Sequence, residues 1–183
     1  MPDTTEGDDV DYAERLAASS DVGKNAWQAT LDEMDALADE FEAEGWQTVT
    51  IAAGHTAPEN PSTGEGDRFG LTHVVPNNKA EEFTDLFEEG AFPQYEVYRN
   101  EIEGREFVVT VLSDPEKEAA ILIAGSYELR HAPGCVKAAK REGKMYTHVQ
   151  TLDKTHLGSF EHDDYTRFFP NADRIENWVR SGN

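Results

Sequence analysis

The chain has 183 residues and carries 37 Asp and Glu against 16 Lys and Arg, a formal net charge of -21. It also has nine Phe and three Trp residues, which a disordered acidic tail would lack. This composition indicates a folded protein whose acidic surface suits molar salt, where the Debye length falls to about 3 Å. One cysteine excludes an intrachain disulfide, and no apolar run reaches the roughly 18 residues of a membrane span. We therefore expect a cytoplasmic protein that does not enter membranes.

The N-terminal part is predicted to be a leader followed by a helix and a strand. Residues 1–20 are acidic and poor in large apolar residues, so we expect a disordered leader there, with 21–183 forming a single α+β domain. From 25 to 44, apolar residues recur at spacings of three and four, which predicts an amphipathic helix. Gly45 suits the end of this helix, and residues 46–53 are expected to form a strand.

The middle of the chain is predicted to contain a loop, a short helix and several strands. Residues 54–67 are rich in Gly and Pro, so we expect an irregular loop. A helix is expected over 77–88. Strands are expected over 68–75, 95–102, 105–112 and 119–129. Glu103-Gly104 is a plausible hairpin turn between two of them, and the last is apolar on both faces, as in the centre of a sheet.

The C-terminal part is predicted to add a helix over 133–142 that ends at Gly143, a strand over 144–152, and a terminal helix that begins near Asn171 and carries Trp178. Strands joined by tight turns must be antiparallel. The predicted fold is therefore α+β, a single antiparallel sheet of about six strands with helices mainly on one face. Enzymes and binding modules share this layout, so the fold class does not assign a function.

One basic segment stands out in the acidic chain. Five cations lie in 130–144, namely Arg130, Lys137, Lys140, Arg141 and Lys144. Because residues three and four apart share a helix face, we expect this face to bind an anionic macromolecule or a phosphorylated ligand. Phosphate affinity falls steeply with salt, so Tyr146 or His148 would have to add close contacts. The simpler alternatives are cations that complement the helix dipole or that pair with the protein's own acids.

Cys135 supports a second hypothesis. It lies near the start of the same predicted helix, after His131, and a helix N-terminus and an imidazole both lower a thiol pKa. A thiol-dependent enzyme or redox sensor that uses Cys135 with His131 or His148 is therefore an alternative. The simpler explanation is a small buried hydrophobic residue. A third hypothesis is a small-ligand-binding domain, with the ligand between the sheet and the loop at 54–67.

The histidines give no metal prediction. The chain has six of them, and none forms a metal-binding spacing such as HExxH. We therefore predict no metal site and no cofactor, and the oligomeric state stays open.

Three stretches resemble a known family. They are WQTVTIAAGHTAPENP (46–61), AAILIAGSYELRHAPGC (119–135) and MYTHVQTLDKTHLGSFEHDDYTRFFP (145–170). Together with the acidic N-terminal helix, they are similar to a small domain family of halophilic archaea that has no assigned function. The resemblance implies a salt-rich cytoplasm and supplies no catalytic or binding residues. The sequence therefore favours a non-catalytic interaction or regulatory module over an enzyme, with an anionic partner bound through 130–144.

Overall fold

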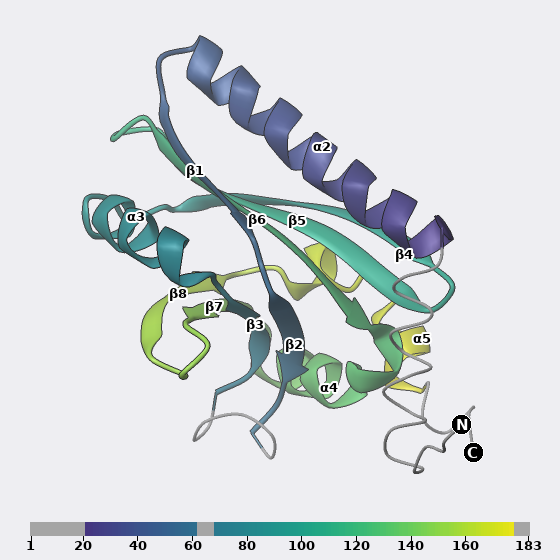
Figure 1. Cartoon of the computed structure of the whole chain (residues 1–183). Coiled ribbons are helices and arrows are strands. Elements are labelled where there is room, and N and C mark those ends of the chain that lie inside the picture. Colours follow the sequence, from purple (N-terminus) through teal and green to yellow (C-terminus); the bar gives the residue numbers. More distant parts are fainter. Residues whose placement is uncertain (1–20, 62–67, 178–183) are drawn as a thin grey trace.

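The residues that the structure describes form two separate four-stranded sheets. The computed structural model of the chain describes residues 21–61 and 68–177, so the expected leader at 1–20, and Trp178, lie outside it. In spatial order, sheet A contains β1 (Gln47–Ala52), β6 (Ala119–Glu128), β5 (Arg105–Asp114) and β4 (Gln94–Ile102). Sheet B contains β2 (His55–Glu59), β3 (Gly70–Val74), β7 (Met145–Gln150) and β8 (His156–His162). The helices are α2 (Asp21–Ala43), α3 (Asn77–Glu88), α4 (Pro133–Glu142) and α5 (Ala172–Glu176), with 3-10 turns η1 (Leu129–His131) and η2 (Tyr165–Arg167) (Figure 1).

The prediction of a single antiparallel sheet of about six strands, with helices mainly on one face, was wrong. β1 pairs in parallel with β6, and β3 pairs in parallel with β7, so both sheets are mixed. Strand β2 lies in the segment that was expected to be an irregular loop. Its Pro58 argued against a strand, but β2 is at the edge of sheet B, where a proline is tolerated. Strand β8 was not expected, because its buried positions carry Gly158, Phe160 and His162 where aliphatic residues are usual.

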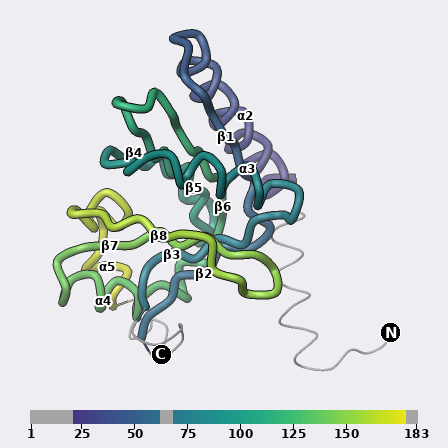
Figure 2. The backbone as a smooth tube through the Cα atoms, turned by 90° about the vertical axis from the view of Figure 1, so that its left-hand side faces the viewer, coloured from purple at the N-terminus to yellow at the C-terminus, as the bar shows by residue number. Residues whose placement is uncertain are grey.

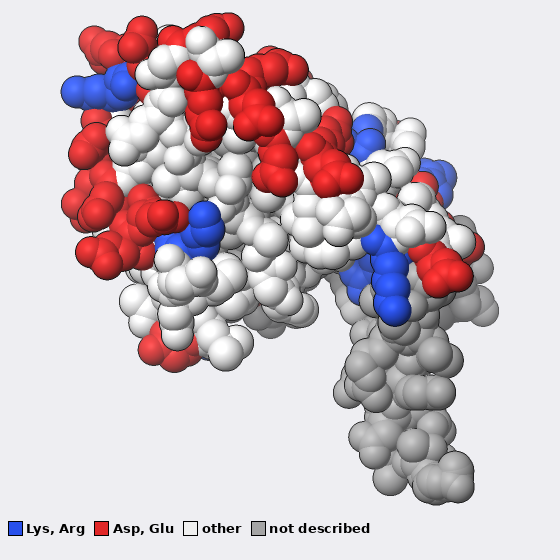
Figure 3. All heavy atoms as spheres, turned by 45° about the horizontal axis from the view of Figure 1, so that its top comes forward, with Lys and Arg blue, Asp and Glu red and all other residues white. Residues whose placement is uncertain are grey.

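Sheet A is covered on its outer face by α2. Met34 and Ala38 of this helix pack against Val109, Leu122 and other apolar side chains of β5 and β6. The opposite side of α2 carries acids, and these gather in one band over the helix (Figure 3). The apolar stripe predicted for this helix is therefore confirmed, and the helix separates the core of sheet A from water.

The inner face of sheet A packs toward sheet B. Ile51, Leu112 and Ile121 of sheet A share one buried cluster with Val149 and Phe160 of sheet B, and α3 adds Phe83 and Leu86. Figure 2 shows the strands of sheet B lying below sheet A, on the side away from α2. The order of layers is therefore α2, sheet A and sheet B.

Several local predictions are confirmed. Glu103 and Gly104 have φ of 53° and 83° and connect β4 to β5, which fits a two-residue turn with positive φ at both positions. Strand β6 lies inside sheet A and is buried along most of its length. Helix α4 ends at Gly143, which has a left-handed conformation with φ of 72°.

Helix α4 closes one end of the two-sheet core. Its residues Cys135, Val136 and Ala139 are buried in a cluster with Phe69 and Met145. Helix α5 joins the same cluster and lies against α4. This packing places the C-terminal end of α4 beside β7. Among the described residues, no helix is both long and apolar enough to cross a membrane.

Candidate anion-binding cleft

A cleft of about 590 Å³ opens over the outer face of sheet B, which is the face turned away from sheet A. It is lined by Pro61, Arg68, Phe69, Arg141, Glu142, Lys144, Tyr146 and His148. Its three cations come from three places in the chain: the residues before β3, the end of α4 and the start of β7. The volume lies in the range of small-molecule sites, about 300–1,000 Å³.

The turn that ends α4 brings two of these cations to the cleft. The Gly143 N–H donates to the Ala139 carbonyl at 2.8 Å, and the left-handed Gly143 reverses the chain directly into β7. Arg141 and Lys144 therefore lie on either side of a tight turn. This geometry needs a glycine, because an L side chain is strained at a φ of 72°.

Aromatic rings form the wall of the cleft. The Tyr146 ring lies parallel to the His148 ring, with centroids 5.6 Å apart, and meets the Phe69 ring edge-on at 5.3 Å. The Lys144 Nζ lies 5.6 Å from the centroid of the Tyr146 ring. Tyr146 and His148 are neighbours on one face of β7 because alternate residues of a strand point to the same side. The cleft thus combines a flat unsaturated wall with a cationic rim.

A chain of hydrogen bonds connects three lining residues of the cleft, Arg68, Phe69 and His148, to exposed residues of β8. Arg68 Nη1 lies 3.4 Å from His156 Nδ1, and His156 Nε2 lies 3.1 Å from Ser159 Oγ. Ser159 Oγ lies 2.7 Å from His148 Nδ1, and His148 Nε2 lies 2.8 Å from the Phe69 carbonyl oxygen. Ser159 and His148 face each other across the β7–β8 pair. Five groups from three segments are therefore connected.

The two ends of this chain fix the direction of every hydrogen bond. The Phe69 carbonyl only accepts, so His148 carries its proton on Nε2 and accepts on Nδ1. The Arg68 guanidinium only donates, so neutral His156 accepts on Nδ1 and donates from Nε2. The Ser159 hydroxyl then accepts from His156 and donates to His148. Each ring thus has one tautomer that satisfies both of its contacts.

Burial keeps both imidazoles neutral. Only 3% of His148 is exposed, and burial lowers its pKa to about 4, with a further contribution from the nearby Arg68 charge. The bond to the Phe69 carbonyl opposes this shift and is the weaker effect. Burial and Arg68 also lower the pKa of the more exposed His156. At neutral pH, His148 therefore offers an unprotonated Nδ1 to Ser159.

The contacts of Arg68 are long for charge-assisted hydrogen bonds. Its Nη2 lies 3.3 Å from Gln150 Oε1 and 3.6 Å from Glu59 Oε1. Lys140, in contrast, has two carboxylate oxygens at 2.7 and 2.8 Å. Charge-assisted hydrogen bonds are usually shorter, about 2.7–2.9 Å. The Arg68 guanidinium can therefore improve its contacts by turning toward an anion.

The structure divides the predicted basic face into parts with different surroundings. Arg141 and Lys144 join the cleft, where Arg141 also lies 3.2 Å from Glu142. Lys140 points to α5 and binds Asp173 and Glu176, which raise its pKa. Arg130 lies 3.2 Å from Glu128, outside the cleft.

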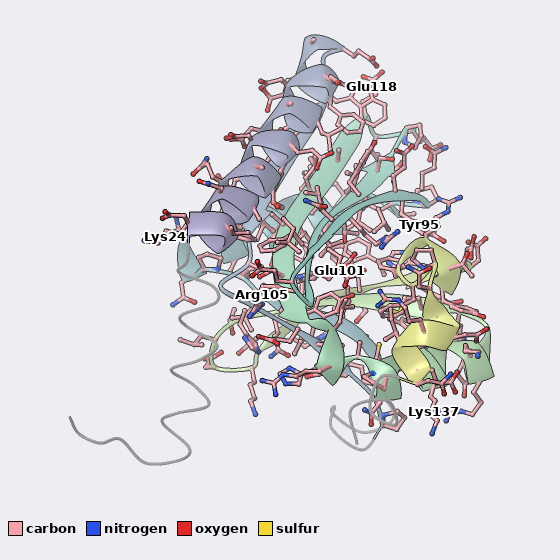
Figure 4. The ribbon with its side chains drawn as sticks, turned by 90° about the vertical axis from the view of Figure 1, so that its right-hand side faces the viewer. Lys24, Tyr95, Glu101, Arg105, Glu118 and Lys137 are labelled. Atoms are coloured by element: carbon pink, nitrogen blue, oxygen red, sulfur yellow. The ribbon has the colours of Figure 1, made fainter. Side chains whose placement is uncertain are left out.

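Lys137 is exposed and projects from the outer side of α4 (Figure 4). It does not line the cleft. The five cations therefore do not form one face, and only two of them come together with Arg68.

The predicted thiol site has surroundings unlike those that the hypothesis requires. Cys135 is fully buried, and burial raises its pKa to about 12. The backbone groups of Gly70 and Glu59 that hydrogen-bond to the thiol lower the pKa by less than burial raises it. His131 lines a different cleft, and His148 is bonded to Ser159 and Phe69. The structure thus gives this thiol the packing role of a small apolar side chain.

Sequence reasoning missed Arg68, His156 and Ser159 as site residues. Arg68 was assigned only to a strand, and 156–162 was assigned to no element. The signal in this segment was the alternation of polar Ser159 and Glu161 with Gly158, Phe160 and His162, which has the period of a strand, and the structure buries the second set. Within residues 21–61 and 68–177, no three His, Cys, Asp or Glu side chains are placed to hold a metal ion.

The comparisons with known proteins place the chain in a family without assigning an activity. A family model covers residues 13–170, which includes the cleft and both sheets. No curated protein and no solved structure is significantly similar to the chain. The chain belongs to DUF7529, a family of unknown function.

Proposed function

We propose that this domain binds a small phosphorylated ligand in the cleft between the end of α4 and the outer face of sheet B. The observation that carries the proposal is the convergence of Arg68, Arg141 and Lys144 on one cleft in a chain of net charge -21. Mutual attraction does not explain their proximity, because like charges repel. Glu142 and Glu59 offset part of that repulsion, and a bound anion would offset more of it.

The proposal keeps the anionic partner expected from the sequence but favours a small molecule over a macromolecule. The cleft holds about 590 Å³, and its cations are bordered by Glu142. The exposed Glu161 accepts a hydrogen bond from the Tyr146 hydroxyl at 3.1 Å and adds a further carboxylate beside the wall of the cleft. A nucleic acid would have to approach the acidic remainder of the surface as well, and that surface repels polyanions.

The chemistry of the lining fits a phosphate group beside a flat or apolar group. Guanidinium groups donate two parallel hydrogen bonds to phosphate oxygens, and an ammonium group adds a point charge. The rings of Phe69 and Tyr146 offer an apolar surface to the rest of the ligand. These close contacts matter in high salt, where long-range attraction is screened.

Isothermal titration calorimetry with inorganic pyrophosphate, at fixed ionic strength, tests this proposal. Pyrophosphate should bind the wild-type protein with one site per chain. Arg141→Glu should weaken binding roughly 10- to 150-fold, because a hydrogen bond to a charged group contributes about 1.5–3 kcal/mol. Lys144→Glu should act in the same direction.

Lys137→Glu is the matched control, because it makes the same charge change on the same helix outside the cleft. This variant should keep the wild-type affinity. Absence of binding to the wild type would contradict the proposal. So would an equal loss in Arg141→Glu and Lys137→Glu, because it would show a general effect of net charge.

We also propose that the protein works in the cytoplasm of a halophilic archaeon. The net charge of -21 and the band of acids over α2 support this environment (Figure 3). Dense carboxylates repel one another strongly at low ionic strength and weakly at molar salt. The free energy of unfolding should therefore rise as KCl is added. Between about 0.1 and 1 M salt, the Debye length shrinks from about 10 to 3 Å. A free energy of unfolding that stays constant over this range would contradict the proposal.

A further inference from the structure

We propose that the outer face of sheet B beside the cleft is also a catalytic site, in which the exposed Ser159 is a nucleophile and His148, which lines the cleft, is its general base, for hydrolysis of an ester that carries an anionic group. The anionic part of this substrate rests on the proposed function. The catalytic part rests mainly on Ser159 and His148, and neither of them is among the cations of the cleft. The two parts can therefore fail separately.

The first argument is the geometry of the nucleophile and its base. Ser159 Oγ lies 2.7 Å from His148 Nδ1, within the distance at which a base accepts a hydroxyl proton. Ser159 is exposed, whereas His148 is buried beneath the ring of Tyr146. The hydroxyl is thus open to a substrate, and the base is shielded from competing water.

The second argument is that a third group orients the base. The Phe69 carbonyl holds the Nε2 proton of His148 at 2.8 Å, so Nδ1 has its lone pair directed at Ser159. A nucleophile, a base and an orienting acceptor in sequence are the arrangement found in activated hydroxyl groups. Phe69 and Ser159 are distant in the chain. Both reach His148 because β3 pairs with β7, and β7 pairs with β8.

The third argument is a donor placed where charge would develop. His156 Nε2 lies 3.1 Å from Ser159 Oγ and carries a proton directed at it. As its proton leaves, Oγ gains negative charge, and this donor stabilises that charge. Arg68, on the other nitrogen of the His156 ring, polarises that donor further.

The chemical steps balance without a metal or cofactor. Ser159 Oγ bonds to the ester carbonyl carbon while its proton passes to His148 Nδ1. The bond from that carbon to the leaving alcohol oxygen breaks, and His148 returns the proton to this oxygen. Water then attacks the acyl group on Ser159, gives a proton to His148, and releases the acid as Ser159 regains its proton. One ester and one water thus yield one acid and one alcohol.

Labelling with an alkyl fluorophosphonate tests the catalytic part. This probe forms a phosphorus–oxygen bond with an activated serine and releases fluoride, and mass spectrometry locates the adduct. We expect time-dependent labelling of the full chain at Ser159 alone. Ser159→Ala should abolish labelling. His148→Asn should slow it by about 100-fold or more, the usual contribution of a general base.

Two controls separate the possible failures. Ser126→Ala removes a serine of sheet A and should leave labelling unchanged. Ser159→Ala should still bind pyrophosphate, which shows that the variant is folded and that binding does not need the nucleophile. No labelling of the wild type, labelling at another residue, or labelling that is unchanged in His148→Asn would overturn the catalytic proposal. None of these results bears on anion binding.

Discussion

The two sheets of this protein differ in their buried side chains, because sheet B buries more polar groups than sheet A. In sheet A, the central strands carry aliphatic residues on both faces, and Ile121, Leu122 and Ile123 are completely buried. In sheet B, the buried positions include imidazole, hydroxyl and amide side chains: Thr56, Thr72, His73, Thr147, His148, Gln150 and His162. The comparison indicates that sheet A supplies most of the apolar core, whereas sheet B carries polar groups at a cost in stability.

Sheet B limits that cost by pairing imidazoles with hydroxyl groups across neighbouring strands. Thr56 Oγ1 lies 2.9 Å from His73 Nδ1, and Thr147 Oγ1 lies 2.8 Å from His162 Nε2. The pair of Ser159 and His148 follows the same pattern, but its serine is exposed on the outer face of sheet B. The pairs inside the core are structural, and the exposed pair is the one we assign to chemistry.

The largest expected effect is the loss of stability of sheet B in mild acid. Burial lowers the pKa of His73 to about 3 and of His148 and His162 to about 4, compared with an ordinary value of 6.5. Below pH 6.5 the unfolded chain binds protons that the folded chain does not. The free energy of unfolding therefore decreases as the pH is lowered. Each histidine contributes about 1.4 kcal/mol per pH unit, until its folded pKa is reached.

Urea unfolding at pH 7, 6 and 5 in constant KCl measures this slope. His162→Phe should reduce the slope by removing one of the three groups, because a phenyl ring can replace the imidazole between Tyr95 and Phe168. His55→Ala, at an exposed position, should leave it unchanged. A free energy of unfolding that is constant from pH 7 to 5 would show that the buried histidines of sheet B do not resist protonation.

The next effect sharpens the comparison at neutral pH. Ile123→Ala removes a fully buried side chain from the inner face of sheet A and should lower the free energy of unfolding by about 2–5 kcal/mol. Ser159→Ala, at an exposed position of β8, should lower it by less, about 1 kcal/mol, because the buried His148 Nδ1 loses its hydrogen-bond donor. Chemical unfolding of both variants tests the division. Similar losses in the two variants would contradict it.

The smallest expected effect concerns the cation that lies outside the cleft. Lys140→Ala removes two contacts to α5, but surface ion pairs contribute little. We expect unfolding and pyrophosphate affinity to be indistinguishable from those of the wild type. A loss of pyrophosphate affinity in Lys140→Ala as large as that in Arg141→Glu would show that Lys140 belongs to the binding site. It would favour the basic helix face that was predicted from the sequence.

Elements that depend on local chemistry could be predicted from the sequence. The hairpin at Glu103-Gly104, the buried strand β6 and the end of α4 at Gly143 each follow from residues adjacent to them. The division into two sheets could not be predicted in this way. It depends on parallel pairing of β1 with β6 and of β3 with β7, and these contacts join distant segments.

The same distinction explains the candidate site. The cluster of cations in 130–144 was visible in the sequence, but the pairing of Lys140 with Asp173 depends on how α5 packs against α4. Arg68 enters the cleft from the residues before β3, and Ser159 reaches His148 through a strand that was not expected. Local spacing carries no information on such long-range contacts.

The most direct test of the cleft is a nuclear magnetic resonance titration of the labelled protein with pyrophosphate, at constant ionic strength. We predict that the largest shifts of backbone amide signals occur at Arg141, Lys144, Tyr146 and His148, and that the amides of α2 stay unchanged. Shifts concentrated on α2 or spread evenly over both sheets, or no shifts beyond those caused by an equal ionic strength of KCl, would contradict an anion-binding cleft on sheet B.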